Sequence, residues 1–108
     1  MIDAPQTDVA GGGAFSVVDA RWAFGGALTL ENAADVLSAS ESLPLPDSGI
    51  VDFGGLMQAD SAALAVMMAL KRRAASERRS LILTGLPASL RSLAIVYGVE
   101  HYLVDAGS

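Results

Sequence analysis

The stretch that decides the fold is residues 50–64, which read IVDFGGLMQADSAAL. Residues 50–53 are typical of a short buried strand, and the pair Gly54-Gly55 predicts a turn at its end. Asp60 or Ser61 then supplies the side-chain oxygen that is favoured at a helix start. A strand that leads directly into a helix indicates an α/β domain.

The helix that follows is predicted to run from Asp60 or Ser61 to about Glu77. Its core stripe, at i, i+3, i+4, i+7 and i+11, consists of Ala63, Val66, Met67, Leu70 and Ala74. Leu64 and Met68 form a second apolar line, and a chain of 108 residues has few elements left to cover it. We therefore expect both side chains to be substantially exposed and the isolated domain to self-associate without a partner. The alternative is that they lie under a neighbouring loop or helix.

Upstream, the alternation of Phe15 and Val17 predicts a strand, and residues 22–28 predict its hairpin partner. Gly25-Gly26 predicts a weakened strand or a bulge. A first helix is predicted to start at the N-cap residue Thr29, because its apolar residues have helical spacing. These residues are Leu30, Ala33, Ala34 and Leu37. Residues 44–49, rich in Pro, Ser and Gly, predict a loop.

Downstream, residues 80–84 predict another strand, and Gly85-Leu86-Pro87 turns it into a third helix with Pro87 near the first helical position. That helix has the apolar stripe Leu90, Leu93, Ala94 and Tyr97. Gly98 suits its C-terminal cap, and residues 99–104 predict a short final element. The order ββαβαβα predicts a mixed, mostly parallel sheet of about four strands with helices packed against it.

The domain is expected to span residues 14–104, between a flexible tail over residues 1–13 and a short tail over residues 105–108. The chain has no cysteine and one histidine, His101, so we expect no disulfide, no metal site and no Ser/His triad. The N-terminus lacks the basic and apolar regions of a signal peptide. The longest apolar run, residues 62–70, is too short to span a membrane, which favours a cytoplasmic location.

The net charge of −5 argues against nucleic acid as a partner. Residues 1–60 hold nine acids and one base, whereas residues 61–108 hold six bases and three acids. Five bases fall close together: Lys71, Arg72, Arg73, Arg78 and Arg79. This cluster is either the solvated end of a helix or a contact for an acidic partner surface.

The sequence shows little enzyme chemistry, and we expect neither catalysis nor a cofactor. Gly54-Gly55 lacks the spacing of a dinucleotide loop and the Lys-Ser/Thr of a phosphate loop. Asp52-Phe53-Gly54 matches a kinase triplet by letters alone. A lone histidine without a recognisable second group has no defined catalytic role.

Two motifs carry a resemblance to a known family. The segments VDFGGL (51–56) and ADSAAL (59–64) resemble the core of the STAS family, in which a strand and loop lead to an Asp-Ser/Thr at a helix start. The segments LTGLP (83–87), LRSLA (90–94) and YGV (97–99) are similar to the STAS subunit of the Mla phospholipid transporter. The resemblance covers about residues 14–104, with Ala63 standing where many members have glycine.

The resemblance implies a non-enzymatic cytoplasmic subunit that binds the ATPase subunit of an ABC transporter. That transporter moves phospholipid between bacterial membranes and supports outer-membrane lipid asymmetry, and the subunit would sit at the inner membrane only through the complex. The family's contact maps onto Asp60 and Ser61 with Ala62 and Leu64. Together with the apolar line and the basic cluster, the expected partner-binding residues are Asp60, Ser61, Ala62, Leu64, Met68 and Lys71.

Three alternatives stay open. The resemblance also fits an anti-sigma factor antagonist, in which a partner kinase phosphorylates the serine at the position of Ser61. A small flavodoxin-like protein that binds a phosphorylated ligand is a third class. For Ser61 itself, the competing interpretation is a helix cap without any partner, with Asp60 beside it as the other candidate cap.

Overall fold

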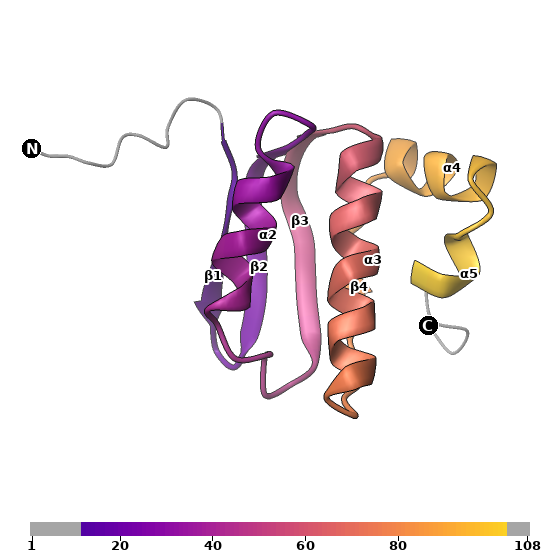
Figure 1. The fold of residues 1–108 in the computed structure, drawn as a ribbon. Coiled ribbons are helices and arrows are strands. Elements are labelled where there is room, and N and C mark those ends of the chain that lie inside the picture. The colour runs from indigo at the N-terminus through magenta and orange to yellow at the C-terminus, as the bar shows by residue number, and fades with distance from the viewer. Residues whose placement is uncertain (1–11, 104–108) are drawn as a thin grey trace, which may run out of the picture.

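The computed structural model describes residues 12–103, which form a four-stranded sheet and four helices (Figure 1). The strands are β1 (Ala14–Val18), β2 (Arg21–Leu28), β3 (Ile50–Ala59) and β4 (Ile82–Thr84). The helices are α2 (Ala33–Glu41), α3 (Ser61–Ser76), α4 (Ala88–Val96) and α5 (Glu100–Leu103). The predicted ββαβαβα order is confirmed, with α5 as the short final element.

The sheet has the order β1-β2-β3-β4 and is mixed, as predicted. β1 and β2 pair antiparallel, whereas β2–β3 and β3–β4 pair in parallel. The hairpin turn consists of Asp19 and Ala20, both with positive φ, as the two-residue turn of type I′ requires. Register shifts between β2 and β3 lie on either side of Gly25-Gly26, which confirms the predicted bulge.

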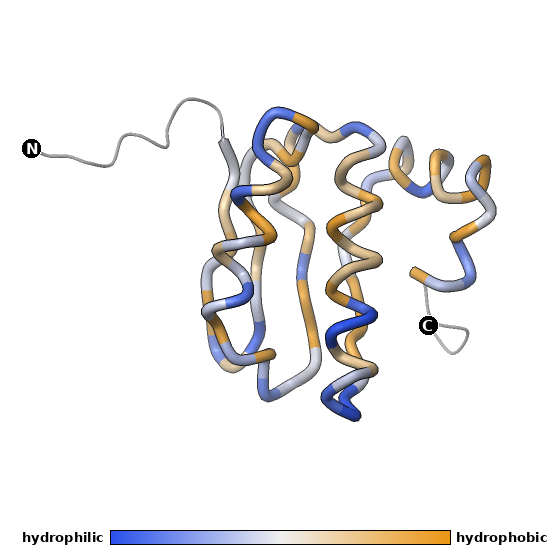
Figure 2. The backbone as a smooth tube through the Cα atoms, viewed as in Figure 1, coloured by the Kyte–Doolittle hydropathy of each residue, from blue (hydrophilic) through white to orange (hydrophobic). Residues whose placement is uncertain are grey.

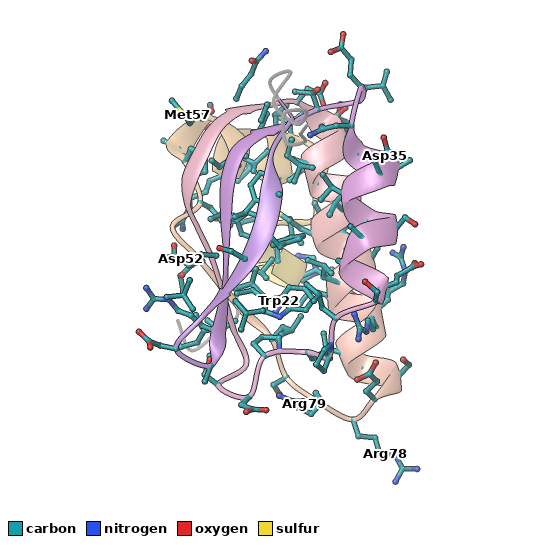
Figure 3. All side chains as sticks on the ribbon, turned by 90° about the vertical axis from the view of Figure 1, so that its left-hand side faces the viewer. Trp22, Asp35, Asp52, Met57, Arg78 and Arg79 are labelled. Carbon is teal, nitrogen blue, oxygen red and sulfur yellow. The ribbon has the colours of Figure 1, made fainter. Side chains whose placement is uncertain are left out.

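Helices α2 and α3 lie side by side on one face of the sheet, and the core fills the space between them and the strands (Figure 1). Alternate residues of β2 and β3 point into it, so Trp22 faces the helices while Asp52 lies on the opposite face (Figure 3). The predicted stripe of α3 is confirmed, because each of its five residues is at most 2% exposed: Ala63, Val66, Met67, Leu70 and Ala74.

Helix α2 begins later than predicted, at Ala33, so the placement of its start at Thr29 is wrong. The reason is the side chain of Asn32, which forms hydrogen bonds with the backbone of two residues that precede it. Its Oδ1 accepts from the N–H of Thr29 at 2.9 Å, and its Nδ2 donates to the carbonyl of Ala27 at 2.9 Å. Asn side chains compete with helical hydrogen bonds in this way. Leu30 therefore lies outside the apolar stripe and is 81% exposed.

The predicted turn at Gly54-Gly55 is also wrong, because β3 continues through both glycines to Ala59. Gly55 pairs with Gly25 of β2, and a Cβ on Gly55 would lie 2.7 Å from the carbonyl oxygen of Phe24. The glycine is thus required by the close approach of two strand backbones.

The expected exposure of Leu64 and Met68 is contradicted. Leu64 is only 4% exposed, and Met68 is partly buried against the core. The last helices supply the cover: α4 and α5 both contact α3, and they add Leu90, Ala94 and Leu103 to the same apolar cluster. The prediction for Tyr97 is wrong in the opposite direction, because this residue was placed on the buried apolar stripe of α4 and is 58% exposed.

Helix α4 ends as predicted at Gly98, which has positive φ. The N–H of Gly98 donates to the carbonyl of Ile95, and the N–H of Val99 donates to that of Ala94. This pair of bonds is a Schellman motif.

The predicted N-terminal tail lies outside the described residues except for Gly12 and Gly13. The N–H of Gly13 donates to the carbonyl of Ala27 at 2.9 Å, so these two residues contact the sheet. The predicted C-terminal tail, residues 105–108, lies wholly outside the described residues.

Candidate functional site at the start of α3

Asp60 is the N-cap of α3 and joins two segments that are far apart in the sequence. Its Oδ1 accepts from the N–H of Ala62 at 2.8 Å, and its Oδ2 accepts from the N–H of Leu30 at 3.1 Å. One carboxylate thus satisfies a free N–H of the first turn and holds the loop between β2 and α2 against it. The negative charge also suits the positive end of the helix dipole.

Ser61 is the first residue of α3 and is exposed. Within residues 12–103, its hydroxyl has no hydrogen-bond partner, and the cap is made by Asp60 instead. The interpretation of Ser61 as a helix cap is therefore wrong. Its hydroxyl is left to water or to a binding partner.

Two large apolar side chains in the segments that adjoin this helix start are exposed, and they were not predicted as site residues. Leu30 is 81% exposed and Met57, on the last part of β3, is 85% exposed. Met57 lies at the end of the molecule where β3 passes into α3 (Figure 3). The exposure of Leu30 could have been predicted from Asn32, because asparagine favours the N-cap position and a helix that starts after it leaves Leu30 outside the helix. We define the α3 N-terminal surface as Leu30, Met57, Asp60, Ser61 and Ala62.

Three of the six predicted partner-binding residues do not belong to this surface. Leu64 is buried in the core. Met68 and Lys71 lie seven and ten residues beyond Ser61, about 10 and 15 Å along the helix axis. The Nζ of Lys71 donates to the carbonyl of Leu81 at 2.7 Å, which ties α3 to the segment before β4.

A protein-family model described as "Mlab, STAS domain" matches residues 15–105, nearly the whole chain. The strand β3, the cap at Asp60 and the exposed Ser61 all fall within the match. The chain belongs to the MlaB-like STAS domain family. No curated protein matches the sequence significantly. Family membership gives this STAS domain an accessory or regulatory role.

The basic cluster of this STAS domain lies at the other end of α3, where hydrophilic residues gather (Figure 2). Arg73 donates to the carbonyls of Ser40 and Leu43 and pairs with Glu77 at 2.9 Å. Arg79 donates to the carbonyl of Pro46 at 2.5 Å. Together with Lys71, these cations fasten α3 to neighbouring loops. Arg72 and Arg78 are the exposed members of the cluster.

The described part of this STAS domain offers few groups for other chemistry. No three His, Cys, Asp or Glu side chains among residues 12–103 are placed to hold a metal ion. His101 is exposed on α5. No helix in that range has the length and apolar character needed to cross a bilayer.

Proposed function

We propose that this STAS domain is a non-enzymatic accessory subunit that binds and supports the ATPase subunit of a phospholipid ABC transporter. In this role it acts in the cytoplasm, at the inner membrane, and supports outer-membrane lipid asymmetry. The MlaB-like family supports the assignment. The observation that carries it is the exposed, unbonded Ser61 at a helix start, with exposed Leu30 held to Asp60 and exposed Met57 on the strand that leads into the helix.

The chemistry of the α3 N-terminal surface suits a protein partner. Exposed apolar side chains such as Leu30 and Met57 favour association, because a partner that covers them removes apolar surface from water. Asp60 has both oxygens bonded internally, so its burial in a complex leaves those bonds in place. The hydroxyl of Ser61 can both donate and accept a hydrogen bond. The surface therefore presents apolar area around one adaptable polar group.

The test is calorimetric titration of the full chain against the purified ATPase subunit of the Mla-type transporter from the same cells. Ser61→Asp should fold normally, because a carboxylate suits a helix N-terminus. It should bind at least about tenfold more weakly, a loss of roughly 1.4 kcal/mol, because the new charge is desolvated without a paired cation.

The matched control is Ser76→Asp, which places the same change at the opposite end of α3 and should leave the affinity within about twofold. Thermal melts of each variant separate folding from binding. Equal affinities of wild type and Ser61→Asp, with intact folds, would contradict the proposal.

A second candidate is an anti-sigma factor antagonist regulated by phosphorylation of Ser61. It is favoured by the same exposed hydroxyl, which a kinase could reach. A phosphate there would add about −1.5 to −2 charge at neutral pH. Affinity capture from native lysate with phosphopeptide mapping separates the two: the first predicts a transporter ATPase as partner, and the second predicts an anti-sigma kinase and phosphate on Ser61.

A further inference from the structure

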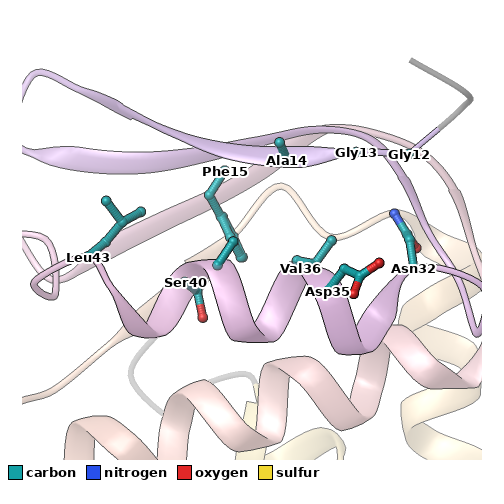
Figure 4. Close-up of a pocket in the computed structure, with 10 residues that line it drawn as sticks. Gly12, Gly13, Ala14, Phe15, Asn32, Asp35, Val36, Ser40 and Leu43 are labelled. Atoms are coloured by element: carbon teal, nitrogen blue, oxygen red, sulfur yellow. The ribbon is translucent and has the colours of Figure 1, made fainter. Parts of the chain in front are cut away.

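A groove of about 270 Å³ lies between β1 and α2, on the side of α2 that faces the edge of the sheet (Figure 4). Its walls are the backbone of residues 12–15 and one side of α2. Phe15, Val36 and Leu43 make it apolar, and Asn32 and Asp35 stand at one end (Figure 4). A volume of this size accommodates an aliphatic side chain.

The strand that forms one wall has a free edge. β1 is the outermost strand of the sheet and pairs only with β2. In a ladder closed by a two-residue turn, Val18 and Arg21 form a hydrogen-bonded pair, so the N–H and C=O groups of Phe15 and Val17 point away from β2. Within residues 12–103 these groups make no other backbone hydrogen bond.

The usual obstacles to strand addition are missing at this edge. Residues 12–18 contain no charged side chain and no proline, the residue types that commonly block sheet edges. Val17 is 59% exposed. An edge strand with an apolar groove beside it combines two features of peptide recognition, main-chain hydrogen bonds for affinity and a side-chain pocket for specificity.

The charge around the groove indicates what kind of segment it fits. Asp35 lines the groove, is exposed, and has no ion pair among residues 12–103. Helix α2 carries no lysine or arginine, and none lines the groove. An apolar side chain in the groove is therefore complemented by a neighbouring cation that reaches Asp35.

We propose that β1 and α2 form a second docking site, which takes an extended segment of a partner protein carrying an aliphatic residue flanked by Lys or Arg. The segment pairs with the free edge of β1, its aliphatic side chain enters the groove, and its cation meets Asp35. The site is separate from the α3 N-terminal surface and does not depend on the function proposed for it.

Two other occupants fit the groove less well. A second copy pairing through β1 would bring together chains of net charge −5, without a cation for Asp35. A fatty acyl chain would fill the apolar part, but it would leave the edge groups of Phe15 and Val17 unpaired. Of these three occupants, only a basic, apolar peptide matches the backbone edge, the groove and the carboxylate together.

The experiment selects binders from a random 12-residue peptide display on the full chain, and the best sequences are synthesised. The selected peptides should share an aliphatic residue next to Lys or Arg, and their affinity should fall as salt rises. Amide shifts in NMR spectra should cluster at residues 12–17 and on α2. No enrichment, enrichment without basic residues, or shifts elsewhere would overturn the proposal.

Variants separate the parts of the site. Val17→Pro removes an outward N–H without removing a hydrogen bond to β2, and it should weaken peptide binding at least about tenfold. Ala39→Phe fills the groove from an exposed position of α2 and should do the same. Asp35→Lys should weaken binding at least about threefold. The control is Ser38→Phe, which adds a phenyl ring on α2 outside the groove and should change the peptide affinity by less than about twofold.

Thermal melts check that each variant folds. If Val17→Pro does not fold, Ala39→Phe still tests the proposal. Peptide affinity that is unchanged in folded Ala39→Phe and Asp35→Lys overturns the proposal. Sedimentation that shows a dimer lost in Val17→Pro, or peptide displaced by fatty-acid micelles but not by salt, would assign the groove to the other occupants.

Discussion

The carboxylate of Asp60 accepts a hydrogen bond from the backbone N–H of Leu30 at 3.1 Å, across thirty residues of sequence. The same carboxylate caps α3 through Ala62. The exposed leucine and the exposed Ser61 are therefore held beside each other by one side chain.

Asp60→Ala should lower the free energy of unfolding by about 1–2 kcal/mol, because the helix loses its cap and Leu30 loses its acceptor. Asp60→Asn keeps one acceptor oxygen for the cap, but its amide NH₂ cannot accept from the N–H of Leu30, so it should cost about 0.5–1 kcal/mol, less than the alanine variant. Urea denaturation measures both, and hydrogen exchange at the Leu30 amide should speed up in the alanine variant. Equal stability of wild type and Asp60→Ala would show that the cap contributes nothing.

Ser61→Ala should change stability by less than about 0.5 kcal/mol, because the hydroxyl makes no hydrogen bond and the position is exposed. The comparison with Asp60→Ala is the internal control, since the two substitutions lie side by side in the same first turn. A loss above about 1 kcal/mol in chemical denaturation would mean that Ser61 caps the helix after all.

Leu64→Ala should cost about 2–5 kcal/mol of stability, because the side chain is 4% exposed and its removal leaves a cavity. Met57→Ala should cost less than about 0.5 kcal/mol, because that side chain is 85% exposed. Under the proposed function, Met57→Ala should instead weaken binding to the ATPase subunit. Thermal melts and calorimetry of both variants test whether Leu64 belongs to the core and Met57 to the surface. Similar melting temperatures of the two variants would contradict this assignment.

Arg78→Gly should stabilise the domain by about 1 kcal/mol. Arg78 ends α3 in a left-handed conformation with φ of 59°, where its N–H donates to Ala75 and the next N–H donates to Ala74. A side chain with a Cβ is strained there, and glycine is the usual residue. The control is Arg72→Gly, which should destabilise by about 1 kcal/mol because it is an exposed position inside the same helix. A lower melting temperature for Arg78→Gly would contradict this account.

Much of the architecture followed from local patterns. The i, i+3, i+4 stripe of α3, the glycine cap at Gly98 and the hairpin of residues 14–28 depend on contacts within a few residues, which sequence spacing records directly. The strand-to-helix motif ending at Asp60 and Ser61 also pointed to the STAS family, which the family match confirms.

Two of the errors share a cause, because each concerns residues whose environment comes from a distant segment. Leu64 was predicted to be exposed, but α4 and α5 pack against α3 and cover it. Gly54-Gly55 was predicted to form a turn, but β3 continues through both glycines, and Gly55 is required where the backbones of β2 and β3 come close. A third error, the start of α2, has a local cause, because it was decided by the side chain of Asn32, which reaches back five residues to Ala27.

The sequence by itself determined the α/β class, the order of elements, the core face of α3 and the position of the Asp60-Ser61 helix start, because periodicity and capping are local. Only the tertiary structure decided which apolar residues stay exposed and what lies beside them. Leu30 and Met57 stay exposed, and the groove between β1 and α2 exists, because burial depends on how the elements pack against each other.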